Sequence, residues 1–145
     1  MQSMGGTQAI DNFERRNLRT RSQSNYDALR NRIDALAAET SEPDWDCERA
    51  PSIPAQDWDA AAKLCIAILD KLLPPPFISP CGDGTIHLSI QHLGKEALIE
   101  LNGNQMRITF YDANHRMIDS TGIIALDITD CLNRLQDGFT TKSIY

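Results

Sequence analysis

The chain has 145 residues, of which 41% are hydrophobic, and a formal net charge of −6. A chain of this length suits one domain and can bury enough surface to fold without metal or disulfide support. Residues 1–23 carry four arginines against Asp11 and Glu14, a net charge of +2, so residues 24–145 carry −8. This acidic body excludes a broad nucleic-acid platform, because phosphate binding depends on Lys and Arg side chains.

Residues 1–23 are predicted to form a flexible basic arm, because Gly, Gln, Ser and Arg dominate and apolar residues are sparse. The arginines of this arm are Arg15, Arg16, Arg19 and Arg21. They make nucleic acid a second candidate partner, after a protein.

Residues 24–39 are predicted to form a helix with one narrow apolar stripe. The stripe consists of Tyr26, Leu29, Ile33 and Leu36, which recur at helical spacing. A narrow stripe suits a seam between two helices better than a deep core. We therefore expect this helix to pack peripherally or against a second copy, with these four residues as a homodimer contact.

Residues 54–73 are predicted to form the central helix. Pro54 suits a first helical turn, and acidic residues follow it where the helix dipole favours them. Apolar residues occupy most sides of the segment, and the three prolines at 74–76 end it. We expect its apolar side chains to lie in the core.

Alternating apolar and polar residues predict an antiparallel meander of three or four strands. The strands are expected at residues 85–93, 96–101 and 105–112, with a fourth at 116–120. A turn at 93–94 pairs Ile90 with Ala97 and keeps the apolar residues of both strands on one face.

The turn between the second and third strands fixes their expected register. A two-residue turn at 102–103 pairs Ile99 with Met106 on the apolar face. On the other face, the same turn sets Leu98 opposite Arg107.

Residues 123–137 are predicted to form the last helix, and Gly138 is expected to be its C-cap. The apolar positions at helical spacing are Ile124, Ile128, Leu132 and Leu135. The expected fold is therefore α+β. It consists of the meander, covered on one face by the helices at 54–73 and 123–137, within a single domain at 24–145.

In the segment that joins the central helix to the meander, Pro76, Ile78, Pro80, Asp83 and Gly84 form a P-x-I-x-P-x-x-D-G turn. With this turn, the segment resembles a family of small uncharacterised bacterial proteins. The resemblance covers about a third of the chain. It implies a helix, this turn and a short antiparallel sheet, and it implies no established activity.

The histidines and cysteines do not form a recognisable catalytic or metal-binding motif. His87 and His92 lie five residues apart in one expected strand, so they point to opposite faces. Cys81 lies in a Gly-rich turn, whereas a nucleophilic cysteine needs a base and an oxyanion hole that the fold positions. We therefore expect no enzyme activity, no cofactor and no metal.

The four cysteines are Cys47, Cys65, Cys81 and Cys131, and none forms a C-x-x-C pair. The sequence alone leaves disulfide pairing open. The polar N-terminus lacks the apolar segment of a signal peptide, so we expect a reducing cytoplasm. No apolar run reaches transmembrane length, so no membrane partner is expected.

The face of the sheet that points away from the helices is the expected contact surface. Its partner-binding residues are predicted to be His87, Leu98, Arg107 and Tyr111, since apolar and aromatic residues beside Arg are typical of interfaces. The function predicted from the sequence is protein binding without catalysis, as in an inhibitor, an immunity or antitoxin-like factor, or an accessory subunit. The alternative is a nucleic-acid-associated protein that uses the arginine arm.

Overall fold

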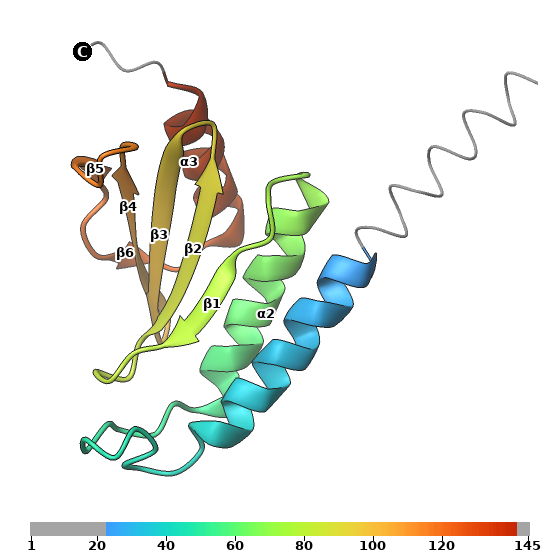
Figure 1. Cartoon of the computed structure of the whole chain (residues 1–145), viewed down its shortest axis with the longest axis vertical. Coiled ribbons are helices and arrows are strands. Elements are labelled where there is room, and N and C mark those ends of the chain that lie inside the picture. The colour runs from blue at the N-terminus through green and yellow to red at the C-terminus, as the bar shows by residue number, and fades with distance from the viewer. Residues whose placement is uncertain (1–22, 142–145) are drawn as a thin grey trace, which may run out of the picture.

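The computed structural model describes residues 23–141, which form three helices and one antiparallel sheet (Figure 1). The helices span residues 23–39, Ala55–Asp70 (α2) and Ile128–Thr140 (α3). The strands are β1 (Phe77–Pro80), β2 (Ile86–His92), β3 (Lys95–Asn102), β4 (Gln105–Tyr111), β5 (Met117–Ser120) and β6 (Ile124–Ala125). The α+β class and the antiparallel sheet are therefore confirmed.

The sheet has more strands than the three or four that we expected. Its order is β1-β2-β3-β4-β5, and β6 also pairs with β4. The sequence pattern did not predict β1, because Pro76 precedes it and Pro80 ends it. Proline is nevertheless tolerated in a strand at the edge of a sheet. The pattern did not predict β6, because Ile124 matches the helical spacing, whereas the structure pairs Ile124 with Met106.

The pairing of β2 with β3 is confirmed, but the expected pairing of β3 with β4 is wrong. Ile90 pairs with Ala97 as predicted. Ile99 pairs with Ile108, because the turn consists of residues 103–104. This moves the register by two residues, so Leu98 lies opposite Thr109. An even shift leaves every side chain on its predicted face.

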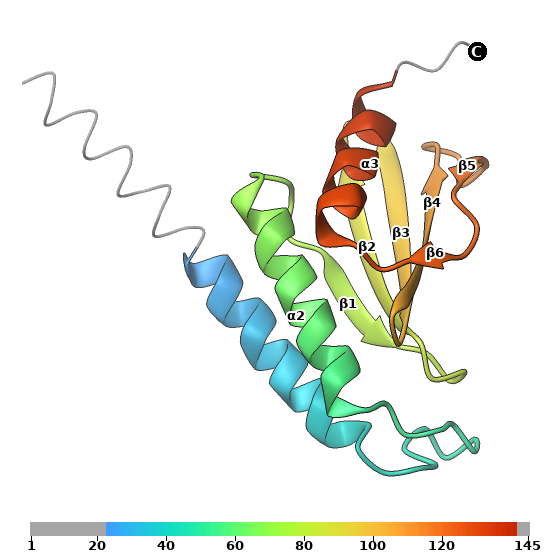
Figure 2. The same cartoon turned by 180° about the vertical axis from the view of Figure 1, so that it is seen from behind.

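The helices lie on one face of the sheet. In Figures 1 and 2, α2 and α3 both pack on this face, and the helix at 23–39 lies along the outer side of α2. The strand residues that point toward them are buried, namely Ile86, Leu88, Ile90, Ala97, Ile99, Leu101, Met106, Ile108 and Phe110. The core therefore lies between the sheet and the helices.

The apolar stripe of the helix at 23–39 is covered within one chain. Leu29, Ile33 and Leu36 are buried in the core, and Tyr26 packs against it partly buried. Of the two expected arrangements, the structure shows the helix lying along α2 of the same chain, so the stripe is covered without a second copy. Homodimerisation stays a prediction, but these residues do not offer a free surface for it.

A buried hydrogen-bond chain fixes the connection between the helix at 23–39 and α2. The indole Nε1 of Trp58 donates to Thr40 Oγ1 at 2.9 Å, and Thr40 Oγ1 donates to Leu36 O at 2.8 Å. Both Trp58 and Thr40 are almost fully buried. The polar groups of these two side chains therefore satisfy each other inside the core.

Thr40→Val should destabilise the protein by about 1–3 kcal/mol, because it leaves the buried Trp58 N–H without an acceptor. The shape of the side chain is almost unchanged, so the loss reports the hydrogen bond. Urea unfolding followed by circular dichroism measures it. Thr129→Val on the exposed side of α3 is the matched control, and an equal loss in both variants would contradict the assignment.

Helix α3 begins and ends later than expected. Asp127 is its N-cap, and its side chain accepts a hydrogen bond from Asp130 N. Gly138 lies inside the helix, so its predicted role as the C-cap is wrong. A Cβ atom built on Gly138 would lie 2.1 Å from Cζ of Phe110. The glycine thus allows close contact between α3 and the sheet.

Gly138→Ala should destabilise the protein by about 1–3 kcal/mol, because the added methyl group overlaps a core aromatic ring. Helix propensity alone predicts the opposite sign, since alanine favours a helix over glycine by about 1 kcal/mol. Thermal unfolding of the variant decides between the two signs. Gln136→Ala, at an exposed position of the same helix, should change the melting temperature little.

Candidate functional site

The face of the sheet opposite the helices carries the candidate site, which we call the open face. We define it by the outward side chains of the three central strands. They are His87, Ser89 and Gln91 on β2, Glu96, Leu98 and Glu100 on β3, and Arg107, Thr109 and Tyr111 on β4. These residues alternate with the buried core residues, and most are partly or fully exposed.

The register arranges the open face in three rows across the strands. The first row contains His87, Glu100 and Arg107. The second contains Ser89, Leu98 and Thr109, and the third contains Gln91, Glu96 and Tyr111. Charged groups thus occupy the first and third rows, and the central row is uncharged.

An ion pair holds the first row together. Arg107 Nε lies 3.3 Å from Glu100 Oε1, and Arg107 Nη2 donates to Glu100 Oε2, also at 3.3 Å. His87 Nε2 lies 4.0 Å from the same carboxylate. The pair is partly exposed to solvent, so it contributes at most about 1 kcal/mol to stability. Its larger effect is to fix the position of the Glu100 carboxylate on the open face.

Asp83, Thr85 and His87 form a hydrogen-bonded chain at one end of the open face. Thr85 Oγ1 lies 2.6 Å from Asp83 Oδ1 and 3.1 Å from His87 Nε2. A hydroxyl has a single hydrogen, and the short distance assigns it to the carboxylate. His87 therefore donates to Thr85 and does not act as a base toward it. The chain lacks the arrangement of an activated nucleophile.

The bonds from Thr85 hold the pKa of Asp83 below its ordinary value of 3.8. The Thr85 hydroxyl contributes most, followed by the Thr85 backbone N–H, and the Cys81 thiol adds a smaller effect. Asp83 is thus a fixed negative charge beside the first row. Cys81 lies next to this anion, whereas cysteine nucleophiles lie beside cationic groups.

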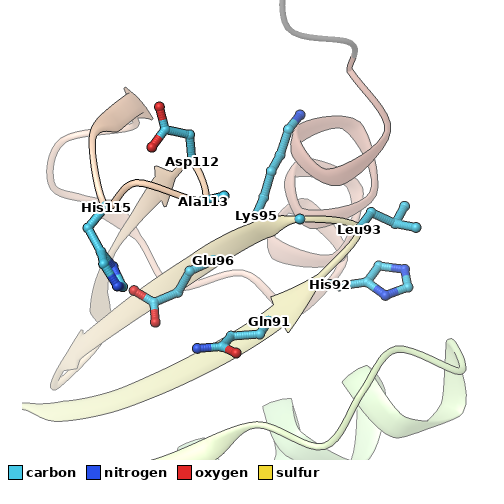
Figure 3. A pocket seen from close by; sticks show the side chains of 9 residues that line it. Gln91, His92, Leu93, Lys95, Glu96, Asp112, Ala113 and His115 are labelled. Atoms are coloured by element: carbon cyan, nitrogen blue, oxygen red, sulfur yellow. The ribbon is translucent and has the colours of Figure 1, made fainter.

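A hollow of about 480 Å³ opens at the other end of the sheet, between the β2–β3 turn and the β4–β5 turn. Figure 3 shows Glu96 and His115 pointing toward one another there, while Lys95 points toward α3. The Lys95 ammonium donates to Gly138 O at 2.8 Å and to Thr141 O. Lys95 therefore binds the carboxyl end of α3, whereas the carboxylate of Glu96 points to the open face.

Three exposed apolar side chains border the open face. Phe77 follows the central row onto β1, where it pairs with Ser89, and Met117 pairs with Tyr111. Ile123 shares a hollow of about 160 Å³ with Arg107 and other residues. These three side chains are 65–67% exposed.

The sequence did not identify these bordering residues. Phe77 lies in the strand that the prolines hid. Ile123 is the first residue of the expected last helix. In the expected fourth strand, Met117 and Ile118 are adjacent apolar residues, so alternation does not show which of them points inward. One signal could have identified Phe77. Its neighbour Ile78 is an apolar residue that β1 buries, so alternation along a strand would place Phe77 on the opposite, exposed face.

The four predicted partner residues lie on one face of the sheet. His87, Leu98, Arg107 and Tyr111 all point away from the helices, on three adjacent strands. The expected contact of Leu98 with Arg107 is wrong in detail, since Arg107 pairs with Glu100. Partner binding by these residues stays a prediction. The arginine arm lies outside the described residues.

The surroundings of His92 and of the two buried cysteines indicate a role in packing. His92 points to the helix face, where its ring packs edge-on against Phe139 at a centroid distance of 5.3 Å. All four cysteines are free thiols. Burial raises the pKa of Cys65 and of Cys131 to about 12. Among residues 23–141, no group of three His, Cys, Asp or Glu side chains is placed to hold a metal ion.

No protein family, no curated protein and no solved structure matches this chain. The resemblance to a family of small bacterial proteins therefore stays a prediction. In the described part of the chain, no helix combines the length and the apolar character that crossing a membrane requires.

Asp83→Asn tests the charge at the end of the open face. A lowered pKa means that folding favours the ionised carboxylate, so its contribution to stability is complete above the ordinary value of 3.8 and is lost as pH falls through the lowered value. The wild type should therefore exceed the variant in stability by a constant amount above about pH 5, and by less below about pH 4. Urea midpoints across this range measure the difference. A difference that does not change with pH would contradict the assignment.

Proposed function

We propose that the chain is a protein-binding factor without catalytic activity, and that the open face is its contact surface. An inhibitor, an immunity or antitoxin-like factor and an accessory subunit are the classes that fit such a role. The observation that carries the proposal is the uneven covering of the sheet. All three helices lie on one side, while the other side presents Leu98 and Tyr111 among polar groups.

The composition of the open face supports binding to a protein. Interfaces are enriched in Tyr, Phe, Met and Arg relative to the rest of the surface. Tyr111 and Arg107 lie on the open face, and Phe77 and Met117 border it. Phe77 lies beside Ser89 and Met117 beside Tyr111, so each of these exposed apolar residues continues the open face at one of its edges.

The chemistry of the polar groups on and beside the open face also supports a binding role. The Thr85 hydroxyl is directed to Asp83, and Arg107 is directed to Glu100. Asp83, Thr85, Glu100 and Arg107 line the same hollow of about 160 Å³, but their hydrogen-bonding groups are directed to one another within the chain. A catalytic site instead needs a nucleophile, a base and a stabilising group around the reacting atom.

Leu98→Glu tests the proposal. It places a charge in the middle of the uncharged row, on a half-buried side chain that points away from the core. Loss of a central apolar anchor costs more than about 2 kcal/mol of binding energy, or about thirtyfold in affinity. We expect a partner captured from nuclease-treated native lysate by the wild type to be lost by the variant.

Leu72→Glu is the matched control, because Leu72 is 73% exposed and follows α2, away from the open face. The control should retain the partner, and circular dichroism should show both variants folded. The affinity of the purified partner for each variant gives the quantitative comparison. Equal capture by the wild type and Leu98→Glu would exclude the open face as the contact surface.

A further inference from the structure

The open face has an excess of negative charge that its own cation does not neutralise. Glu96, Glu100 and Asp83 are the carboxylates on or beside it, and Arg107 is already paired with Glu100. Glu96 accepts a hydrogen bond from Ser89 Oγ at 3.2 Å, and the salt bridges of the described residues do not include it. The charge of −8 on residues 24–145 has the same sign.

This charge distinguishes between the occupants that could cover the open face. A second copy would bring Glu96 and the acidic body against identical groups, which like-charge repulsion disfavours. Nucleic acid and anionic lipid surfaces carry phosphates, which the same carboxylates repel. A basic protein is attracted both over a distance and at contact.

The outward residues of β3 also set the spacing of the groups that a basic partner would have to match. Glu96, Leu98 and Glu100 alternate with buried residues along β3, so all three point outward. Outward neighbours on a strand are about 6–7 Å apart. Leu98 therefore lies between two carboxylates at equal spacing, in the uncharged row that leads to Phe77 at the edge.

We infer that the open face binds a basic protein segment, which sets an apolar side chain on Leu98 and a Lys or Arg side chain against each of Glu96 and Glu100. This inference rests on the proposed function and names the chemistry of its partner. The spacing of about 6–7 Å corresponds to positions i and i+4 of a helix, or to i and i+2 of an extended segment. Arg107 contributes by holding the Glu100 carboxylate in place.

The experiment uses the full chain and a synthetic alanine-based helical peptide, in which Lys residues flank one Leu at i−4 and i+4. A second peptide carries Glu in place of both Lys residues. We expect the Lys peptide to shift the backbone amide signals of β2, β3 and β4 in a ¹⁵N NMR titration. Raising the salt from about 50 mM to about 300 mM should weaken its binding. The Glu peptide should not bind.

Variants of this chain locate the contact. Glu96→Gln and Glu100→Gln should each weaken binding of the Lys peptide about threefold, and the double variant about tenfold. Asp59→Asn, on an exposed position of α2, should leave the affinity unchanged. Thermal unfolding of each variant confirms that the fold is intact.

Several outcomes would overturn the inference. They are equal binding of the Glu peptide, equal weakening by Asp59→Asn, binding of an oligonucleotide to the same residues, and no binding of the Lys peptide up to about 1 mM. The proposed function is tested separately by the captured partner. If that partner is lost with Leu98→Glu but binds the Glu96→Gln/Glu100→Gln variant as tightly as the wild type, the protein-binding function stands and its basic chemistry is wrong.

Discussion

Alternation along β2, β3 and β4 is the constraint on which the rest of the structure depends. Except at His92 and Lys95, every second side chain of these strands is apolar and buried in the core that the sheet forms with the helices, which gives the sheet one buried face. The period of a strand is two, so the remaining side chains must point the other way. The open face is therefore a consequence of the same pattern that builds the core. Its residues can change with little cost to folding, which leaves them available for recognition.

Lys95 and Glu96 show how the two faces are separated at one point of the chain. The Lys95 ammonium binds carbonyl oxygens at the carboxyl end of α3, where the helix dipole favours a cation. The next residue, Glu96, points to the open face. On the helix face, Gly138 lets the ring of Phe110 approach α3, and Phe110 packs edge-on against Phe139. The position of α3 thus depends on both polar and apolar contacts, all of them on the helix side of the sheet.

The sequence predicts the faces of the sheet better than its register. Ile99 was expected opposite Met106 and lies opposite Ile108, but the shift of two residues keeps both side chains in the core. The same shift changes the neighbour of Leu98 from Arg107 to Thr109. Which residues share the candidate site could therefore be predicted from alternation alone. Which of them touch could not, because that depends on the two residues that form the turn.

The features that the sequence did not predict depend on contacts between distant segments. Gly138 at the end of an amphipathic pattern is typical of a C-cap, and only its contact with Phe110 shows that it lies inside the helix. The apolar stripe with Leu29 is narrow, and only the position of α2 shows that one chain covers it. A pattern within one segment reports the side that is apolar. It does not report what covers that side.

The shape of the open face, and the pairing of its polar groups with one another, favour a macromolecule over a small molecule as the ligand. Sites for small molecules are concave and bury most of the ligand, with polar groups that converge on it. Here the hollow beside His115 and the hollow beside Ile123 lie at opposite ends of the sheet, and both are open to solvent. Leu98 lies between them in the uncharged row. Glu100 and Arg107 form an ion pair with each other across adjacent strands. A protein surface can cover such an area as a whole and gain binding energy by removing water from the apolar residues. In the contact that we propose, the carboxylates of Glu96 and Glu100 lie at the edges, where their charge would select the partner more than it would set the affinity.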